Sequence, residues 1–169
     1  MELYLLRHAT AVDREDNRYP EDSLRPLTEE GRMKMQRNAK GMKALGLSFD
    51  LVLSSPYIRA RQTAEIVQDV LRTTKPILTK TLLPETKPQE ITVLINTKYA
   101  HHARILLVGH EPHLSSLFSF LLADKTILDF EFRKGGICQL QTASPLKGGG
   151  ASLDWIMTPS QLRMLKNEN

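Results

Sequence analysis

The chain has 169 residues and a mass of 19.2 kDa, with 41% hydrophobic residues, 25% charged residues and a net charge of +4. A chain of this length buries roughly 70% of its extended surface without disulfides or a structural metal, so we expect one domain over residues 1–169. The composition excludes a disordered, fibrous or membrane-embedded chain. The basic charge is spread along the sequence and only 6% of the residues are aromatic, which argues against a nucleic-acid partner.

Two features of the sequence bear on its compartment. The single cysteine, Cys138, cannot form an internal disulfide, which is typical of a reducing compartment. The apolar run Leu3-Tyr4-Leu5-Leu6 is far shorter than a signal-peptide core or a membrane span. We therefore expect a cytoplasmic protein without a membrane partner.

From the N-terminus, the apolar pattern predicts a buried strand at residues 2–6, which stops at an arginine and a histidine. Residues 10–26 are polar and lack periodicity, as in a surface loop. A helix is expected from its N-cap at Thr28 to Gly46, because apolar residues recur there at helical spacing. The pattern then repeats, with a strand at residues 50–53 and a helix whose apolar stripe covers residues 60–71.

The middle of the chain gives signals of unequal strength. Residues 76–78 and 82–84 resemble short extended segments, and residues 88–99 fit a helix that begins at a proline. Residues 104–108 form a nearly pure apolar run, typical of a central strand. The clearest helical pattern follows over residues 112–122, again with a proline in its first turn.

Two further strand-like segments, residues 137–142 and 151–157, are joined by a glycine-rich loop, which indicates a C-terminal β-hairpin. A short helix is expected after Thr158 and Pro159. Strands that alternate with helices predict an α/β fold of three layers, α/β/α, with a mostly parallel central sheet. Ligands of such sheets bind beyond the carboxyl ends of the strands.

Polar residues follow three of the predicted strands. Arg7 and His8 end the first, the segment from Ser54 to Arg59 follows the second, and Gly109 and His110 follow the third. Guanidinium groups offer several fixed donors to the oxygens of a phosphate, and an imidazole can complete the cage. A neutral histidine can also attack phosphorus and hold the phosphoryl group covalently. Each residue alone has an ordinary structural interpretation, so only their shared position indicates an anion site.

Six segments, in this order, carry a resemblance to a known family: Leu6-Arg7-His8-Ala9, Arg25-Pro26-Leu27-Thr28-Glu29-Glu30-Gly31, Ser54-Ser55-Pro56-Tyr57-Ile58-Arg59-Ala60-Arg61-Gln62-Thr63-Ala64-Glu65, Leu83-Pro84-Glu85, Val108-Gly109-His110 and Trp155-Ile156-Met157-Thr158-Pro159. They are similar to the histidine phosphatase superfamily and, more closely, to its SixA-type phosphohistidine phosphatases. The resemblance covers nearly the whole chain and implies a phosphoglycerate mutase-like α/β/α fold.

The resemblance also implies a role for each converging residue. His8 would be the nucleophile that becomes phosphorylated, while Arg7, Arg59 and His110 would bind the phosphoryl oxygens. No metal and no cofactor are implied. Glu85 stands about where larger relatives carry an acid that protonates the leaving group. Because imidazole leaves more easily than an alkoxide, Glu85 is either that acid or a loop carboxylate that positions water or substrate.

The activity implied by the resemblance is that of a metal-independent phosphatase. It would remove phosphate from a phosphohistidine on a protein, such as a histidine phosphotransfer domain of a signal-transduction phosphorelay. The short chain favours this substrate because little sequence remains for a lid, although residues 10–26 could fold over the site. Two alternatives stay open: a broader phosphomonoesterase for small esters with Glu85 as acid, and a non-catalytic module that only binds phosphoproteins.

The remaining polar groups have simpler interpretations. The run His110-Glu111-Pro112-His113 lacks the spacing of an H-E-x-x-H zinc site, and the His101-His102 pair is expected to be solvated. The Ser54-Ser55 pair is expected to form hydrogen bonds at its strand end, because no nucleophile elbow surrounds it. With two arginines beside it, His8 is expected to have a lowered pKa and to be neutral near neutral pH.

Overall fold

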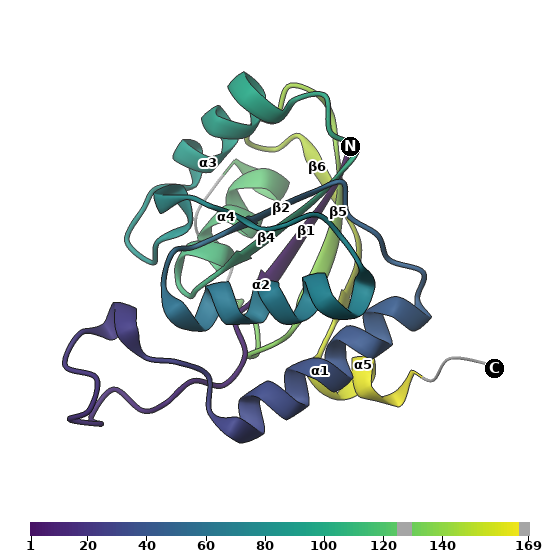
Figure 1. Ribbon diagram of the computed structural model, residues 1–169. Helices are drawn as coiled ribbons and strands as arrows, with labels where there is room; N and C mark the ends of the chain where they lie inside the picture. Colours follow the sequence, from purple (N-terminus) through teal and green to yellow (C-terminus); the bar gives the residue numbers. More distant parts are fainter. Residues whose placement is uncertain (125–129, 166–169) are drawn as a thin grey trace.

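The computed structural model describes residues 1–124 and 130–165, and a central sheet separates two helical layers in it (Figure 1). The strands are β1 (Glu2–Arg7), β2 (Leu51–Ser54), β3 (Ile77–Leu78), β4 (Arg104–Gly109), β5 (Ile137–Thr142) and β6 (Ala151–Met157). The α-helices are α1 (Glu29–Ala44), α2 (Ile58–Leu71), α3 (Pro88–Leu94), α4 (His113–Ala123) and α5 (Pro159–Met164). Short helical turns cover Asp22–Leu24 (η1), Lys80–Leu82 (η2) and Ile95–Tyr99 (η3).

The sheet has the strand order β3-β2-β4-β1-β5-β6. The four strands from β3 to β1 are parallel, and β5 and β6 are added antiparallel to β1 as a hairpin. Both the mostly parallel sheet and the C-terminal hairpin predicted from the sequence are therefore confirmed.

Alternate side chains of each central strand enter two different cores. Leu3 and Leu5 of β1 pack with α3 and α4, whereas Tyr4 and Leu6 pack with α1, α2 and α5. Because these strands are covered on both faces, their sequences are continuously apolar instead of alternating. Each leucine buried in this way stabilises the fold by roughly 1.5–3 kcal/mol relative to an exposed one.

Local sequence signals explain where the helices begin. The Thr28 hydroxyl accepts a hydrogen bond from the backbone N–H of Gly31 at 2.9 Å, which caps α1 as predicted. The prediction of an extended segment at residues 82–84 is wrong, because Leu82 is the last residue of the turn η2. The Thr79 side chain caps this turn by accepting a hydrogen bond from the backbone N–H of Thr81. Pro112 also precedes α4 as its N-cap instead of lying in its first turn.

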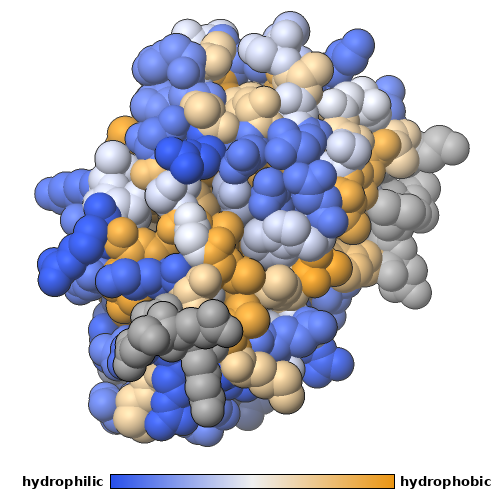
Figure 2. Space-filling view, turned by 90° about the vertical axis from the view of Figure 1, so that its right-hand side faces the viewer, coloured by the Kyte–Doolittle hydropathy of each residue, from blue (hydrophilic) through white to orange (hydrophobic). Residues whose placement is uncertain are grey.

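Large hydrophobic side chains are exposed at several separate places among the described residues. On the face shown in Figure 2, hydrophobic patches lie among hydrophilic ones. In the molecule, the exposed large side chains include Leu45 directly after α1, Val93 in α3 and Leu153 in β6. Exposure of this kind is usual in globular proteins. None of the helices in the described residues is long and apolar enough to cross a bilayer.

The carboxyl ends of three strands are joined just beyond the sheet. The backbone N–H of His8 donates to Gly109 O at 3.0 Å, and that of Ser55 donates to Val108 O at 3.0 Å. These two bonds continue the ladders of β1 with β4 and of β2 with β4. They place His8, Ser55 and His110 next to one another at one edge of the sheet.

Candidate active site

His8 is held in one protonation state by its two hydrogen bonds. Its Nδ1 lies 2.7 Å from Ala9 O, and a carbonyl only accepts, so Nδ1 carries the proton. Its Nε2 lies 3.2 Å from Arg59 Nε, which only donates, so Nε2 offers its lone pair. Burial, followed by the nearby cations Arg59, Arg7 and Lys134, lowers the pKa of His8 to about 3. The predicted direction is confirmed, but burial contributes more than the arginines.

Arg59 connects His8 to the loop before α1. It stands in the first turn of α2 with its side chain 4% exposed. Besides the bond from Nε to His8, its terminal nitrogens donate to the backbone oxygen of Asp22 at 2.6 Å and to Asp22 Oδ2 at 2.7 Å. The centroid of the Tyr57 ring lies 5.0 Å from Arg59 Cζ. One donor nitrogen of Arg59 is therefore directed to His8 and the other two to Asp22.

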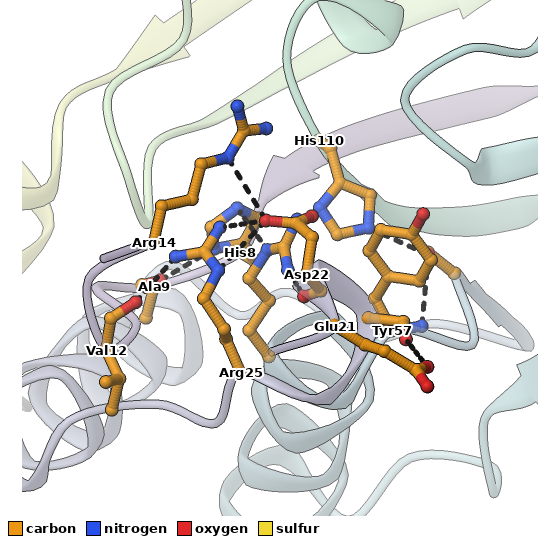
Figure 3. A network of polar contacts seen from close by, with 12 residues as sticks. His8, Ala9, Val12, Arg14, Glu21, Asp22, Arg25, Tyr57 and His110 are labelled. Atoms are coloured by element: carbon orange, nitrogen blue, oxygen red, sulfur yellow. Dashed lines mark hydrogen bonds and ion pairs between the residues drawn. The ribbon is translucent and has the colours of Figure 1, made fainter. Parts of the chain in front are cut away.

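The Asp22 carboxylate lies among three arginines (Figure 3). Besides Arg59, it accepts from Arg25 at 2.5 and 2.9 Å and from Arg14 at 3.2 Å. Partial burial acts to raise the pKa of Asp22, but the hydrogen bonds and charges of Arg59 and Arg25 outweigh it and lower the pKa. Loop 10–26 thus folds over the site. It places the Asp22 carboxylate against Arg59, a residue that the sequence predicts to bind an anion.

His110 lies beside His8, with 5.0 Å between the ring centroids. Its Nε2 is 2.8 Å from the hydroxyl of Ser55, while its Nδ1 is buried without a hydrogen-bond partner among the described residues. Burial, followed by the interaction with the neighbouring His8 ring and the positive charge of Arg59, lowers the pKa of His110 to about 2. The site therefore contains two neutral imidazoles at neutral pH.

Arg7 reaches the same cavity from the end of β1. Its guanidinium donates to Glu131 Oε1 at 2.7 Å and to the backbone oxygen of Phe132, and its Nε is buried without a partner among the described residues. The N–H of Phe132 in turn donates to Glu111 Oε1 at 2.8 Å. The backbone of Phe132 thereby connects Arg7 with the carboxylate of Glu111.

A cavity of about 310 Å³ lies over these residues. Its lining is Arg7, His8, Ala11, Asp13, Arg14, Arg25, Arg59, Pro84, His110, Glu111 and Lys134. Five cationic side chains face it with two acidic ones, which suits a small multivalent anion. A larger cavity of about 670 Å³ is lined by residues of loop 10–26 and by Thr28. Its lining does not include Arg7, His8, Arg59 or His110.

The sequence itself decides the family. The family model of the histidine phosphatase superfamily (branch 1) matches residues 3–94, which is more than half of the chain. The chain belongs to the histidine phosphatase superfamily. The matched range includes Arg7, His8 and Arg59, whereas His110 lies beyond it.

Two relatives match most of the chain, and two solved structures share its fold. An uncharacterised protein of Picosynechococcus sp. is 35% identical over 85% of this chain and 87% of its own. The phosphohistidine phosphatase SixA of Escherichia coli is 27% identical over 98% of this chain and 99% of its own. A structure of the protein histidine phosphatase SixA with tungstate has a TM-score of 0.83 at 24% identity, covering 96% of this chain and 99% of its own. The α-ribazole phosphatase of Shigella flexneri has a TM-score of 0.74 at 20% identity, covering 94% and 97%.

Glu85 is the one predicted site residue that does not line the 310 Å³ cavity. It is exposed in the turn after η2, and its neighbour Pro84 lines the cavity in its place. Its charge acts on Tyr57 instead, whose pKa is raised by burial and then by Glu85 and Asp22. Sequence reasoning missed Asp22 and assigned Arg25 no role, although Arg25 lies in one of the segments similar to the family.

The other polar groups behave mostly as expected. Ser54 and Ser55 form hydrogen bonds at the end of β2. His102, expected to be solvated, lies half-buried with its Nδ1 3.6 Å from Asp50 Oδ1. Among the described residues there is no group of three or more histidine, cysteine or acidic side chains placed to hold a metal ion.

Proposed function

We propose that this chain is a phosphatase that removes phosphate from phosphohistidine on a protein through a covalent intermediate at His8. The observation that carries the proposal is the state of His8. Its proton is bound to a backbone carbonyl, and its Nε2 lone pair, which accepts a hydrogen bond from Arg59, lies at a cationic cavity. A neutral imidazole presented in this way is a nucleophile that needs no separate base.

Two displacements complete the proposed reaction. In the first, the His8 Nε2 lone pair forms a bond to phosphorus while the bond from phosphorus to the substrate nitrogen breaks. The substrate imidazole, protonated on its other nitrogen, takes that electron pair and leaves as a neutral ring. In the second, water attacks phosphorus, the bond to Nε2 breaks, and its electron pair returns to His8. The proton that the water loses passes to the solvent, inorganic phosphate departs and His8 is again neutral with its proton on Nδ1.

Arg7, Arg59 and His110 have the proposed role of binding the phosphoryl oxygens in both steps. They line the same cavity as His8, and Arg59 already contacts the attacking nitrogen. Such donors stabilise the charge on the equatorial oxygens of the transition state. Because arginines supply this charge, we propose that the reaction is independent of metal ions.

The proposed substrate follows from the leaving group and from the relatives. Phosphohistidine needs little help from an acid, and Glu85 does not line the cavity. A SixA relative and a SixA structure, named for phosphohistidine or protein histidine, each match nearly the whole chain. The partner would be a phosphohistidine-bearing protein, such as a histidine phosphotransfer domain in a cytoplasmic signalling pathway.

A rapid-quench experiment tests this proposal. Wild-type protein mixed with a ³²P-phosphohistidine protein in the presence of a chelator is expected to show an acid-labile, base-stable phosphoenzyme and to release phosphate. His8→Asn should lose both, and His101→Asn, which changes an exposed histidine, should keep both. Full turnover by His8→Asn would refute the covalent route, and loss of turnover with the chelator would refute metal independence.

A broader phosphomonoesterase is the second candidate, because the α-ribazole phosphatase shares this fold. A panel of phosphohistidine proteins and small phosphate esters separates the two. The second candidate predicts that Glu85→Gln loses activity on alkyl phosphates but keeps activity on phosphoimidazole donors. Tight binding of phosphoprotein without phosphate release would instead indicate a non-catalytic module.

A further inference from the structure

The side chain that fixes His110 is Ser55, a residue to which neither the family resemblance nor the proposed reaction assigns a part. Ser55 is fully buried at the end of β2, and its hydroxyl lies 2.8 Å from His110 Nε2. The same oxygen accepts a hydrogen bond from the backbone N–H of Tyr57 at 3.3 Å. The question is which of the two groups, hydroxyl or imidazole, donates the bond between them.

A neutral imidazole has one proton, so two arrangements are possible. If His110 Nε2 donated to Ser55, the Ser55 hydroxyl proton would have no acceptor among the described residues, because its contacts there are Tyr57 N–H and His110. A buried hydroxyl without an acceptor costs about 1–3 kcal/mol. If Ser55 donates to Nε2, every polar atom of this chain of contacts is satisfied except His110 Nδ1, which then carries the proton.

His110 Nδ1 is the atom that remains, and it is buried without a partner in the described part of the chain. His110 lines the cationic cavity beside His8. A bare nitrogen lone pair there would repel the oxygens of a phosphate, whereas an N–H would donate to one of them. The orientation of the Ser55 hydroxyl therefore decides whether His110 attracts or repels the ligand.

We propose that Ser55 is a positioning residue that holds His110 as the Nδ1–H tautomer, so that His110 donates a hydrogen bond to a phosphoryl oxygen. The order of donation is Tyr57 N–H to Ser55, Ser55 O–H to His110 Nε2, and His110 Nδ1–H to the anion. The ligand chemistry is that of the proposed function, but the tautomer is a property of the free protein.

Long-range ¹H–¹⁵N NMR of histidine-labelled protein tests the tautomer directly. The wild type should show His110 protonated at Nδ1, and the Nδ1–H signal should shift when inorganic phosphate is added. Ser55→Ala should show protonation at Nε2 in part of the population. Ser54→Ala is the matched control, because that hydroxyl donates to the Ser55 carbonyl and does not contact His110. Protonation of His110 at Nε2 in the wild type would overturn the proposal.

Kinetics supply the second measurement. Ser55→Ala is expected to lower kcat/KM by about 10- to 100-fold, and to add no further loss to His110→Gln, because both changes remove the same donor. Equal activity of Ser55→Ala and wild type would also overturn the proposal. If the wild type releases no phosphate from any donor, the proposed function fails, while the tautomer and its response to inorganic phosphate still decide the role of Ser55.

Discussion

A buried imidazole with one nitrogen bound to a carbonyl has a single nitrogen left for chemistry, and His8 is in that state. The backbone of β1 and its neighbour Ala9 provide this arrangement. The small side chain of Ala9 is buried, and the backbone N–H of Ala9 donates to the Thr63 hydroxyl at 3.1 Å, so the residue after His8 is fixed to α2. The proton position on His8 is therefore determined by main-chain geometry.

We expect His8 to remain neutral, with a proton on Nδ1 alone, through the pH range of a cell. Its pKa, lowered to about 3 mainly by burial, predicts no titration of its ring signals between about pH 5 and 8. Arg59→Gln removes one nearby cation and should raise this pKa, yet keep it below the ordinary value of about 6.5, since burial persists. NMR titration of the folded protein measures both values, with the urea-unfolded chain as control. A pKa above the ordinary value would contradict the expectation.

Asp22 occupies the arginines that a phosphate would use, and this predicts competition. Asp22→Asn keeps the side-chain shape but removes the negative charge beside Arg59 and Arg25. We expect inorganic phosphate to bind about 3- to 10-fold more tightly as a result. Isothermal titration calorimetry measures the change, and Asp16→Asn, which contacts Arg18 away from the cavity, is the control. Weaker binding by Asp22→Asn would show that the carboxylate instead orders the arginines.

At the scale of elements, α1 and α5 approach unusually closely through Gly41. A Cβ added there would lie 2.0 Å from the backbone oxygen of Leu162, so α5 would have to move. We expect Gly41→Ala to lower the free energy of unfolding by about 1–3 kcal/mol. Urea unfolding measures this change. The neighbouring exposed substitution Lys40→Ala should be nearly neutral, and equal stability of the two variants would argue against tight packing of α5.

Periodicity explains which elements could be predicted from the sequence. The strands and long helices each bury a regular set of apolar side chains, and this regularity is visible in the sequence. The placement of Arg7, His8, Arg59 and His110 together follows because β1, β2 and β4 are parallel neighbours.

Contacts between distant irregular segments could not be predicted in this way. Asp22 and Arg59 are separated by 37 residues, and Glu111 and Phe132 by 21. No spacing in the sequence marks either pair, because a loop conformation depends on which charges meet after folding. The same reason explains why the sequence predicts Glu85 at the site, as an acid or as a loop carboxylate, whereas its neighbour Pro84 lines the cavity and Glu85 does not.

For the whole molecule, buried neutral histidines make stability depend on pH. Burial lowers the pKa of His8 to about 3, of His110 to about 2 and of His113 to about 4. The unfolded chain takes up protons on these side chains below about pH 6.5, whereas the folded protein does not. The free energy of unfolding should therefore fall as the pH decreases from about 6.5 to 4, by about 1.4 kcal/mol per pH unit for each histidine.

Urea unfolding at about pH 7 and pH 5 measures this dependence. His113→Gln removes one of the three histidines that take up a proton on unfolding, and His113 does not line the cavity. This change should reduce the dependence of the free energy of unfolding on pH by about a third. Stability that is constant or higher at the lower pH would contradict the assignment of neutral buried histidines.

The bond between His8 Nδ1 and the Ala9 carbonyl has a chemical consequence of its own. Phosphorylated histidine exists as two regioisomers, and here the π nitrogen is blocked by the main chain. Any adduct formed on His8 would consequently be the τ isomer. Of two antibodies that each recognise one regioisomer, only the antibody against τ-phosphohistidine would therefore bind phosphorylated His8.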